Sequence, residues 1–287
     1  MINWQLFFIF VDMTRKSILV IAAAALLALT SCAGGKTGFP KIDQKGKTAI
    51  VAHRGFWNCE AAGFSENSIA SLKAAQDNGL WGSEFDIHIT TDDVILVFHD
   101  KKINGARIDT CASECFADYR LPNGERIPTL DEYLTQGEKC DKTMLVIELK
   151  TEITMEREDA LLDLTIDALE AHNLLDPSRV IFISFSKYLC DRIANEYPQF
   201  VNQYLNGDFT PEELAEFGIN GLDYQDKVVS EDGTIVERAH KLGMSTNVWT
   251  VNTPEKMQEY IGLGINAITT NEPLVLRGLL GDKEFTK

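Results

Sequence analysis

Residue types that can cleave a phosphate ester recur at the ends of apolar, β-rich runs in the first third of this 287-residue chain. Successive residue pairs of this kind are His53 and Arg54, Glu84 and Asp86, and His99 and Asp100. Residues i and i+2 of a strand project to the same face, so Glu84 and Asp86 point together with Cα atoms about 6.6 Å apart. Their oxygens can converge on one hard cation at about 2.0–2.6 Å.

A third carboxylate, Glu148, ends a later apolar run and has Lys150 at i+2. Glu84, Asp86 and Glu148 come from neighbouring predicted strands, and we interpret them as metal ligands. Three oxygen ligands without cysteine favour Mg²⁺ or Ca²⁺ over zinc. Such an ion neutralises phosphate charge and lowers the pKa of bound water.

The remaining polar residues fit the other needs of phosphodiester hydrolysis. We predict that His53 and His99 act as general base and general acid. Arg54 and Lys150 can hold phosphate oxygens, Arg54 through two parallel hydrogen bonds. Trp249 ends a later strand and is either core or a substrate-binding wall.

Each of these residues also has a structural interpretation. A lone histidine is usually structural, but two at strand ends beside metal-type carboxylates favour catalysis. The carboxylates of Glu84 and Asp86 could be a solvated edge, yet Phe85 and Ile87 mark a buried strand, where unpaired carboxylates are costly. His88 shares the face of Asp86 and receives no assigned role.

Apolar β-branched runs alternate with helical stretches, which implies parallel strand pairing. The eight runs are 48–52, 82–89, 144–149, 180–185, 202–205, 221–224, 244–249 and 267–270. Eight units in roughly 250 residues fit a single α/β domain, a (β/α)8 TIM-type barrel, whose active site lies at the carboxyl ends of the strands. An open doubly wound sheet is the alternative, but no Gly-x-Gly-x-x-Gly turn follows the first run.

Several helix ends are also predicted. Ser65 is expected to cap a helix that stops at Asn78-Gly79, and Thr253-Pro254 to begin one that ends near Gly262. Residues 156–172 have helical apolar spacing. Residues 94–99 are expected to fold back as an extra antiparallel strand. Residues 100–143 then form an insertion after the second strand, with a short helix over 129–135.

The N-terminus resembles an export signal. Residues 14–17 are a basic region, residues 18–29 are apolar, and a small-residue site precedes Cys32. We predict a signal peptide over 1–31, with 1–12 as a start-site artefact and Met13 as the natural start. A lipidated, flexible stalk over 32–46 and a barrel domain over 47–287 follow. The lipid on Cys32 would anchor the protein at the periplasmic side of the bacterial envelope; the alternative is an uncleaved N-terminal anchor.

The net charge of −16 at pH 7 restricts the partners. Nucleic-acid affinity comes from neutralising phosphates with Lys and Arg, so a nucleic-acid partner is excluded. No basic patch for anionic lipid is evident, so membrane contact must come from the lipid on Cys32. The expected partner is a small phosphodiester substrate, and no feature predicts an oligomeric state.

Five further cysteines are present, and an exported protein can oxidise such residues. They are Cys59, Cys111, Cys115, Cys140 and Cys190. Cys111 and Cys115 lie in the insertion and Cys140 follows them, so a disulfide is expected in this group. A zinc site is disfavoured because there is no Cys-x-x-Cys pair and no nearby histidine.

Together the ordered motifs resemble the glycerophosphodiester phosphodiesterases from about residue 48 to residue 273. The motifs are His53-Arg54-Gly55, Glu66-Asn67-Ser68, Glu84-x-Asp86, Thr91-x-Asp93, His99-Asp100, Glu148-x-Lys150 and Val248-Trp249-Thr250-Val251-Asn252. The resemblance implies a TIM-type barrel, a Mg²⁺ or Ca²⁺ site at the three carboxylates, and catalytic His53 and His99. It also implies that Arg54 and Lys150 meet phosphate and that Glu66 and Asn67 support the site.

The predicted function is therefore hydrolysis of a glycerophosphodiester to an alcohol and glycerol 3-phosphate. One alternative keeps the site but lets a substrate hydroxyl attack phosphorus and release a cyclic phosphate. A second is a non-catalytic lipoprotein that binds phosphoesters. A metal amidohydrolase is disfavoured because Arg54-Gly55 follows His53 where a His-x-His pair is needed.

Overall fold

A computed structural model describes Ile42 and residues 47–281 of the chain. The predicted signal peptide, the lipidation site Cys32 and nearly all of the predicted stalk lie outside the described residues. Among the helices in the described ranges, none has the length and apolar character needed to cross a membrane.

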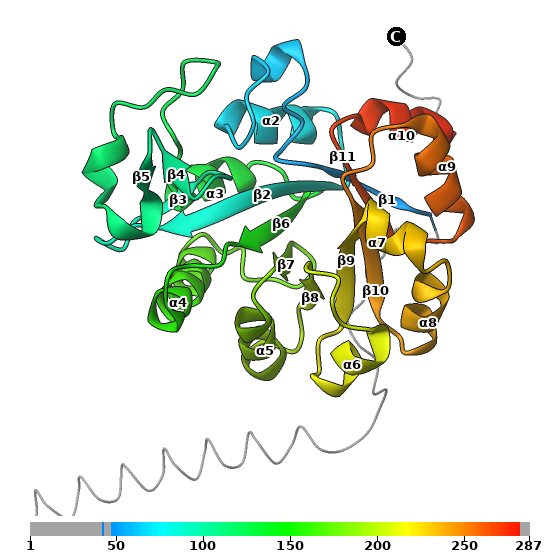
Figure 1. Cartoon of the computed structure of the whole chain (residues 1–287). Coiled ribbons are helices and arrows are strands. Elements are labelled where there is room, and N and C mark those ends of the chain that lie inside the picture. The colour runs from blue at the N-terminus through cyan, green and yellow to red at the C-terminus, as the bar shows by residue number, and fades with distance from the viewer. Residues whose placement is uncertain (1–41, 43–46, 282–287) are drawn as a thin grey trace, which may run out of the picture. The chain divides into compact units, whose positions relative to one another are not determined.

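Eight parallel strands within the described residues close into a barrel (Figure 1). The first strand pairs with both the second and the last, which closes the sheet. The strands are β1 (Ala49–Ala52), β2 (Gly82–Ile89), β6 (Met144–Leu149), β7 (Val180–Ser184), β8 (Val201–Tyr204), β9 (Gly221–Gln225), β10 (Ser245–Trp249) and β11 (Ala267–Thr270). This confirms the predicted TIM-type barrel, with strand ends within one residue of those predicted.

Helices surround the barrel (Figure 1). They are η2 (Glu60–Ala62), α2 (Ile69–Asp77), α3 (Leu130–Gly137), α4 (Met155–Ala171), α5 (Lys187–Glu196), α6 (Pro211–Glu216), α7 (Asp226–Glu231), α8 (Ile235–Lys241), α9 (Pro254–Gly262) and α10 (Pro273–Leu279). Capping boxes begin α3 and α6, and prolines occupy the first turn of α6, α9 and α10.

The expected cap of α2 is wrong by three residues. Ser68 caps this helix: its hydroxyl accepts a hydrogen bond from the Ser71 backbone N–H at 2.9 Å and donates to the Ser65 carbonyl at 2.8 Å. Asn67 has a φ of 53°, so the chain turns sharply just before the helix. Residues 65–67 are therefore used to shape a turn rather than to begin the helix.

The predicted extra strand is present as β3 (Ile95–Val97), antiparallel to β2. After it, the hairpin β4 (Lys102–Ile103) and β5 (Ala106–Arg107) and the short helices η3 (Ile108–Thr110) and η4 (Ser113–Phe116) form the predicted insertion. This insertion packs a small apolar cluster against Leu96 of β3; its own members are Ile103, Ile108, Phe116, Leu121 and Ile127. It ends with α3, which contacts α2 and α4 and takes the place of a barrel helix.

The disulfide expected in the insertion is not formed, and the five described cysteines are free thiols. Cys111 packs against the insertion's small cluster. Cys140 lies after α3, where its thiol is 3.8 Å from the Thr143 hydroxyl. The two cysteines therefore belong to different packing units.

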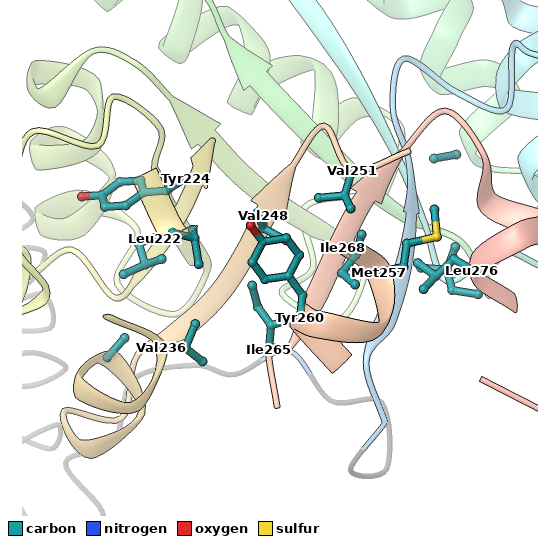
Figure 2. Close-up of a cluster of buried hydrophobic side chains, with 14 of the residues drawn as sticks. Leu222, Tyr224, Val236, Val248, Val251, Met257, Tyr260, Ile265, Ile268 and Leu276 are labelled. Carbon is teal, nitrogen blue, oxygen red and sulfur yellow. The ribbon is translucent and has the colours of Figure 1, made fainter. Parts of the chain in front are cut away.

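Alternation along the strands separates the core from the site. In β9, Leu222 and Tyr224 join a buried cluster that packs against α8, α9 and α10 (Figure 2). Asp223, between them, lines a cavity inside the barrel. In β2, Phe85 and Ile87 likewise pack outward, which leaves Glu84 and Asp86 on the inner face.

Candidate active site

Polar side chains from several strands meet in a cavity at the carboxyl ends of the barrel strands. The cavity measures about 80 Å³, and both predicted catalytic histidines reach it. Its walls are His53, Arg54, Glu84, His99, Glu148, Ile183, Phe185, Leu205, Asp223, Trp249 and Thr269. Residues far apart in the chain thus share one pocket, at the barrel end where function is expected.

The three predicted metal ligands come together. Glu84, Asp86 and Glu148 each place one oxygen within 4.8 Å of the others, and all three are buried. The sheet register causes this, because Asp86 pairs with Glu148 across β2 and β6. Oε1 of Glu84 has no hydrogen-bond partner among the described residues. A buried carboxylate oxygen without a partner, beside two more carboxylates, fits a hard divalent cation.

Burial controls the electrostatics of these acids. Burial and the charge of Asp86 raise the pKa of Glu84 well above its usual range. Burial also raises the pKa of Glu148 to about 7. Asp86 differs: burial alone would raise its pKa, but the cations of Lys150 and Arg54, together with His99, lower it.

Lys150 lies among the carboxylates. Its Nζ is 2.6 Å from Asp86 Oδ1 and 2.6 Å from Glu148 Oε1. Burial opposes its charge, yet these two carboxylates raise the pKa of Lys150 above its usual range. The ammonium is therefore charged and stands beside the space where phosphate is predicted to bind.

The turn after β1 brings Arg54 into contact with Glu84 of the metal group and with Glu66. Arg54 and Gly55 have φ values of 54° and 77°. In this turn the Arg54 backbone N–H donates to Glu84 Oε2 at 2.7 Å, and its Nη1 donates to Glu66 Oε2 at 2.6 Å. A Cβ at position 55 would lie 2.6 Å from Ser71 Cβ, so glycine is required here.

Asn67 supports Asp86 from the turn before α2. Its Nδ2 donates to Asp86 Oδ2 at 2.8 Å, and the Asp86 backbone N–H donates to Asn67 Oδ1 at 3.1 Å. The pair of bonds fixes the carboxylate's orientation. Asn67 thus contacts a predicted metal ligand without being an acidic ligand itself.

A hydrogen bond at Nδ1 orients each of the two predicted catalytic histidines. His53 Nδ1 donates to Asn271 Oδ1 at 2.8 Å, and the Trp57 indole N–H donates to the same oxygen. His99 Nδ1 donates to Asp100 Oδ1 at 2.8 Å. Each ring therefore keeps its Nε2 available for proton exchange.

Both histidines have lowered pKa values, chiefly because burial disfavours the charged ring. The pKa of His53 falls to about 4, with Arg54 as the second cause. For His99, burial outweighs the opposing charge of Asp86. Burial therefore favours the uncharged form of both rings over the imidazolium.

Trp249 forms part of the cavity wall. Its indole N–H donates to the Asp223 backbone carbonyl at 2.9 Å, and its ring meets Phe185 edge to face with centroids 5.6 Å apart. His88, which had no assigned role, is buried near the end of β2: its Nδ1 is 2.9 Å from Glu152 Oε1, and its Nε2 is 3.4 Å from the His99 carbonyl oxygen.

Sequence reasoning missed Asn271, Phe185 and Asp223. Asn271 follows the last strand directly and Phe185 follows β7, so the rule that strand ends carry function could have found both. Asp223 interrupts the apolar β9, and this interruption was its only signal.

Comparisons with known proteins agree with this geometry. Residues 53–275 match the Glycerophosphoryl diester phosphodiesterase family. A glycerophosphodiester phosphodiesterase of Caldanaerobacter subterraneus subsp. tengcongensis is 28% identical over 257 residues, which cover 82% of this chain and 98% of that protein. A crystal structure of a glycerophosphodiester phosphodiesterase from Parabacteroides distasonis is 39% identical with a TM-score of 0.78, covering 82% of this chain and 97% of the other.

A more distant solved structure shows the same fold. An Oleispira antarctica phosphodiesterase, solved with the product sn-glycerol-3-phosphate, has a TM-score of 0.68 at 20% identity, covering 83% of this chain and 98% of that one. With its barrel, its site geometry and a family match over most of its length, this chain belongs to the glycerophosphoryl diester phosphodiesterase family of phosphoric diester hydrolases.

Proposed function

We propose that this protein is a metal-dependent phosphodiesterase that hydrolyses glycerophosphodiesters to an alcohol and glycerol 3-phosphate. The observation that carries this proposal is a group of three buried carboxylates, two of which line one cavity together with both histidines. Membership of the family and the names of its relatives support the substrate class.

Glu84, Asp86 and Glu148 are the residues that would hold the metal. Their oxygen donors favour Mg²⁺ or Ca²⁺. When bound, the ion would neutralise phosphate charge and make a bound water more acidic. Lys150 and Arg54 add positive charge beside the same acids and would bind phosphate oxygens.

His53 and His99 would move the protons. One ring, uncharged, accepts a proton at Nε2 from the water that attacks phosphorus. The other ring must already hold a second proton, as an imidazolium, and donates it to the alkoxide as the bond to phosphorus breaks. Asn271 and Asp100 hold the Nδ1 side of each ring, so exchange takes place at Nε2. Trp249 lines the cavity as a wall for the substrate.

A turnover assay with matched variants tests this proposal. His53→Ala and His99→Ala should each lower kcat by about 10²–10⁴-fold, the range for general acid–base catalysis. His172→Gln, a change at a histidine that ends α4 and does not line the cavity, is the control and should keep wild-type turnover. Phosphorus NMR of the product should show glycerol 3-phosphate. A cyclic phosphate would assign the reaction to intramolecular attack, and no turnover would favour a binding protein.

We also propose that the protein is a periplasmic lipoprotein anchored through Cys32. The support is the basic and apolar sequence before a small-residue site and cysteine. Labelling cells with a fatty-acid analogue should modify the wild type and leave Cys32→Ser unlabelled. Equal labelling of both would contradict the proposal.

A further inference from the structure

The cavity contains a fourth acid that neither the metal group nor the proton transfers use. Asp223 of β9 is 1% exposed and lines the cavity together with His53 and His99. Its Oδ2 accepts a hydrogen bond from Asn247 Nδ2 at 3.1 Å, but its Oδ1 has no hydrogen-bond partner within the described part of the chain. Asp223 also stands outside the group of three carboxylates that could share a metal.

The neighbours of Asp223 do not compensate for its burial. Asn247 is fully engaged, since its Nδ2 also donates to Thr269 and its Oδ1 accepts from the Val248 backbone N–H. Burial, with Glu148 as the second cause, raises the pKa of Asp223 well above its usual range. A buried carboxyl oxygen without a partner is costly unless a ligand supplies one.

The shape of the surroundings indicates what that ligand is. Ile183, Leu205 and the Trp249 ring give the Asp223 cavity apolar walls. At about 80 Å³ it is far smaller than the roughly 300–1,000 Å³ of drug-sized sites, which suits a short alcohol.

A second, more open cavity of about 370 Å³ adjoins it and contains Lys150. His99, Glu148 and Phe185 line both cavities. Since His99 and Glu148 belong to the proposed reaction centre, phosphate would sit at the boundary, with one alcohol of the diester in each cavity.

We infer that Asp223 binds a hydroxyl of the alcohol that remains on the phosphate, and so makes the enzyme selective for glycerol phosphates over esters without that hydroxyl. The inference rests on the proposed function. The small cavity takes the three-carbon glycerol unit, with carbon atoms against the apolar walls and a hydroxyl donating to Asp223 Oδ1. The open cavity takes the leaving alcohol, whose size is less restricted.

A binding experiment tests this without requiring turnover. Calorimetry on the full chain with Mg²⁺ compares sn-glycerol 3-phosphate with n-propyl phosphate, which has the same carbon chain and no hydroxyl. The wild type should bind the glycerol ester more tightly. Asp223→Ala should weaken that binding about 10- to 100-fold, the range for a buried hydroxyl left without its partner, and change propyl phosphate binding less than about threefold. Asp223→Asn, nearly identical in shape, should fall between, because its amide oxygen still accepts.

Asp109→Ala is the matched control, because it removes an aspartate that is also buried but lies in the insertion. It should leave the preference for the glycerol ester unchanged. Equal binding of both esters by the wild type, an equal loss of both in Asp223→Ala, or an undiminished preference in Asp223→Asn and Asp223→Ala would overturn the inference. Wild-type turnover tests the proposed function separately. If the wild type prefers the glycerol ester but does not hydrolyse diesters, the inference about Asp223 stands and the proposed function fails.

Discussion

Replacing Gly55 with alanine should destabilise the protein through two separable effects. The backbone at Gly55 has a φ of 77°, which costs an L-residue about 1–2 kcal/mol. The added Cβ would also lie 2.2 Å from Ser71 Oγ, 2.6 Å from Ser71 Cβ and 2.8 Å from the Ser71 carbonyl carbon. The last two atoms belong to the rigid base of α2, so the clash requires a backbone shift, at about 1–3 kcal/mol.

Gly79→Ala provides the matched control for this prediction. Gly79 has a φ of 60°, but nothing lies within 4 Å of the Cβ it would gain. Both variants lose the same freedom of the unfolded chain, so that contribution cancels. Gly79→Ala should cost about 1–2 kcal/mol and Gly55→Ala about 2–5 kcal/mol, which leaves about 1–3 kcal/mol for the steric contact alone.

Equilibrium urea unfolding, followed by tryptophan fluorescence and circular dichroism, measures the difference. The comparison is valid where the slope against urea matches the wild type. Gly55→Ala should also lose turnover beyond any loss in Gly79→Ala, because a shifted turn moves the Arg54 N–H away from Glu84. Equal destabilisation of the two variants would show that the contact with Ser71 does not constrain the turn, and the reasoning would fail.

Three further predictions concern the metal ligands, the His53 ring and a histidine outside the cavity. Mg²⁺ or Ca²⁺ at 100 times its Kd should raise the free energy of unfolding by about 2.7 kcal/mol, and a chelator should reverse this increase. A melting temperature that does not change with the metal would contradict a site at the three carboxylates. Asn271→Ala should lower kcat roughly tenfold or more with little change in melting temperature, because the His53 ring loses its anchor; an unaltered kcat would show that the ring is held otherwise. Burial alone would lower the pKa of His172, but the carboxylates of Asp131 and Glu138 outweigh burial, and the net pKa is raised. The two ion pairs therefore stabilise the fold fully below pH 6.5, and this stabilisation is lost as the pH rises through the raised pKa of His172. Urea unfolding should therefore show His172→Gln less stable than the wild type by up to about 1 kcal/mol at pH 5.5, with no difference well above the raised pKa; an equal deficit at both would argue against ion pairing.

Much of the fold could be predicted from the sequence because strand and helix periodicities differ clearly. Both faces of barrel strands are covered, so runs such as 82–89 and 144–149 read as strands without further information. The start of α2 was harder, because Ser65 and Ser68 are equally good caps by residue type. In the structure Asn67 is held in a turn by its hydrogen bond to Asp86, and the helix begins after this turn, with Ser68 as its cap.

The candidate site followed from the sequence to the extent that its residues lie at strand ends. The alternation of β2 placed Glu84 and Asp86 on one face, and Glu148 was predicted beside them because it ends a neighbouring strand. The register that pairs Asp86 with Glu148 is known only from the structure. Asp223 was not identified, because the sequence around a single aspartate in a strand does not show whether its carboxylate has a hydrogen-bond partner in the folded protein. Its missing partner becomes visible only when Asn247 and the cavity are placed around it.

The carboxylates that would hold a metal also fix the backbone around them. Arg54 and Asn67 both have positive φ values, at about 1–2 kcal/mol each for residues other than glycine. Hydrogen bonds from Arg54 to Glu84 and from Asn67 to Asp86 offset that strain. Glu84→Ala would therefore remove a ligand and release a turn together, and its effect on activity would have two causes. Glu84→Gln keeps an oxygen for the Arg54 N–H while it removes the charge, so its loss of metal affinity measures the ligand role alone.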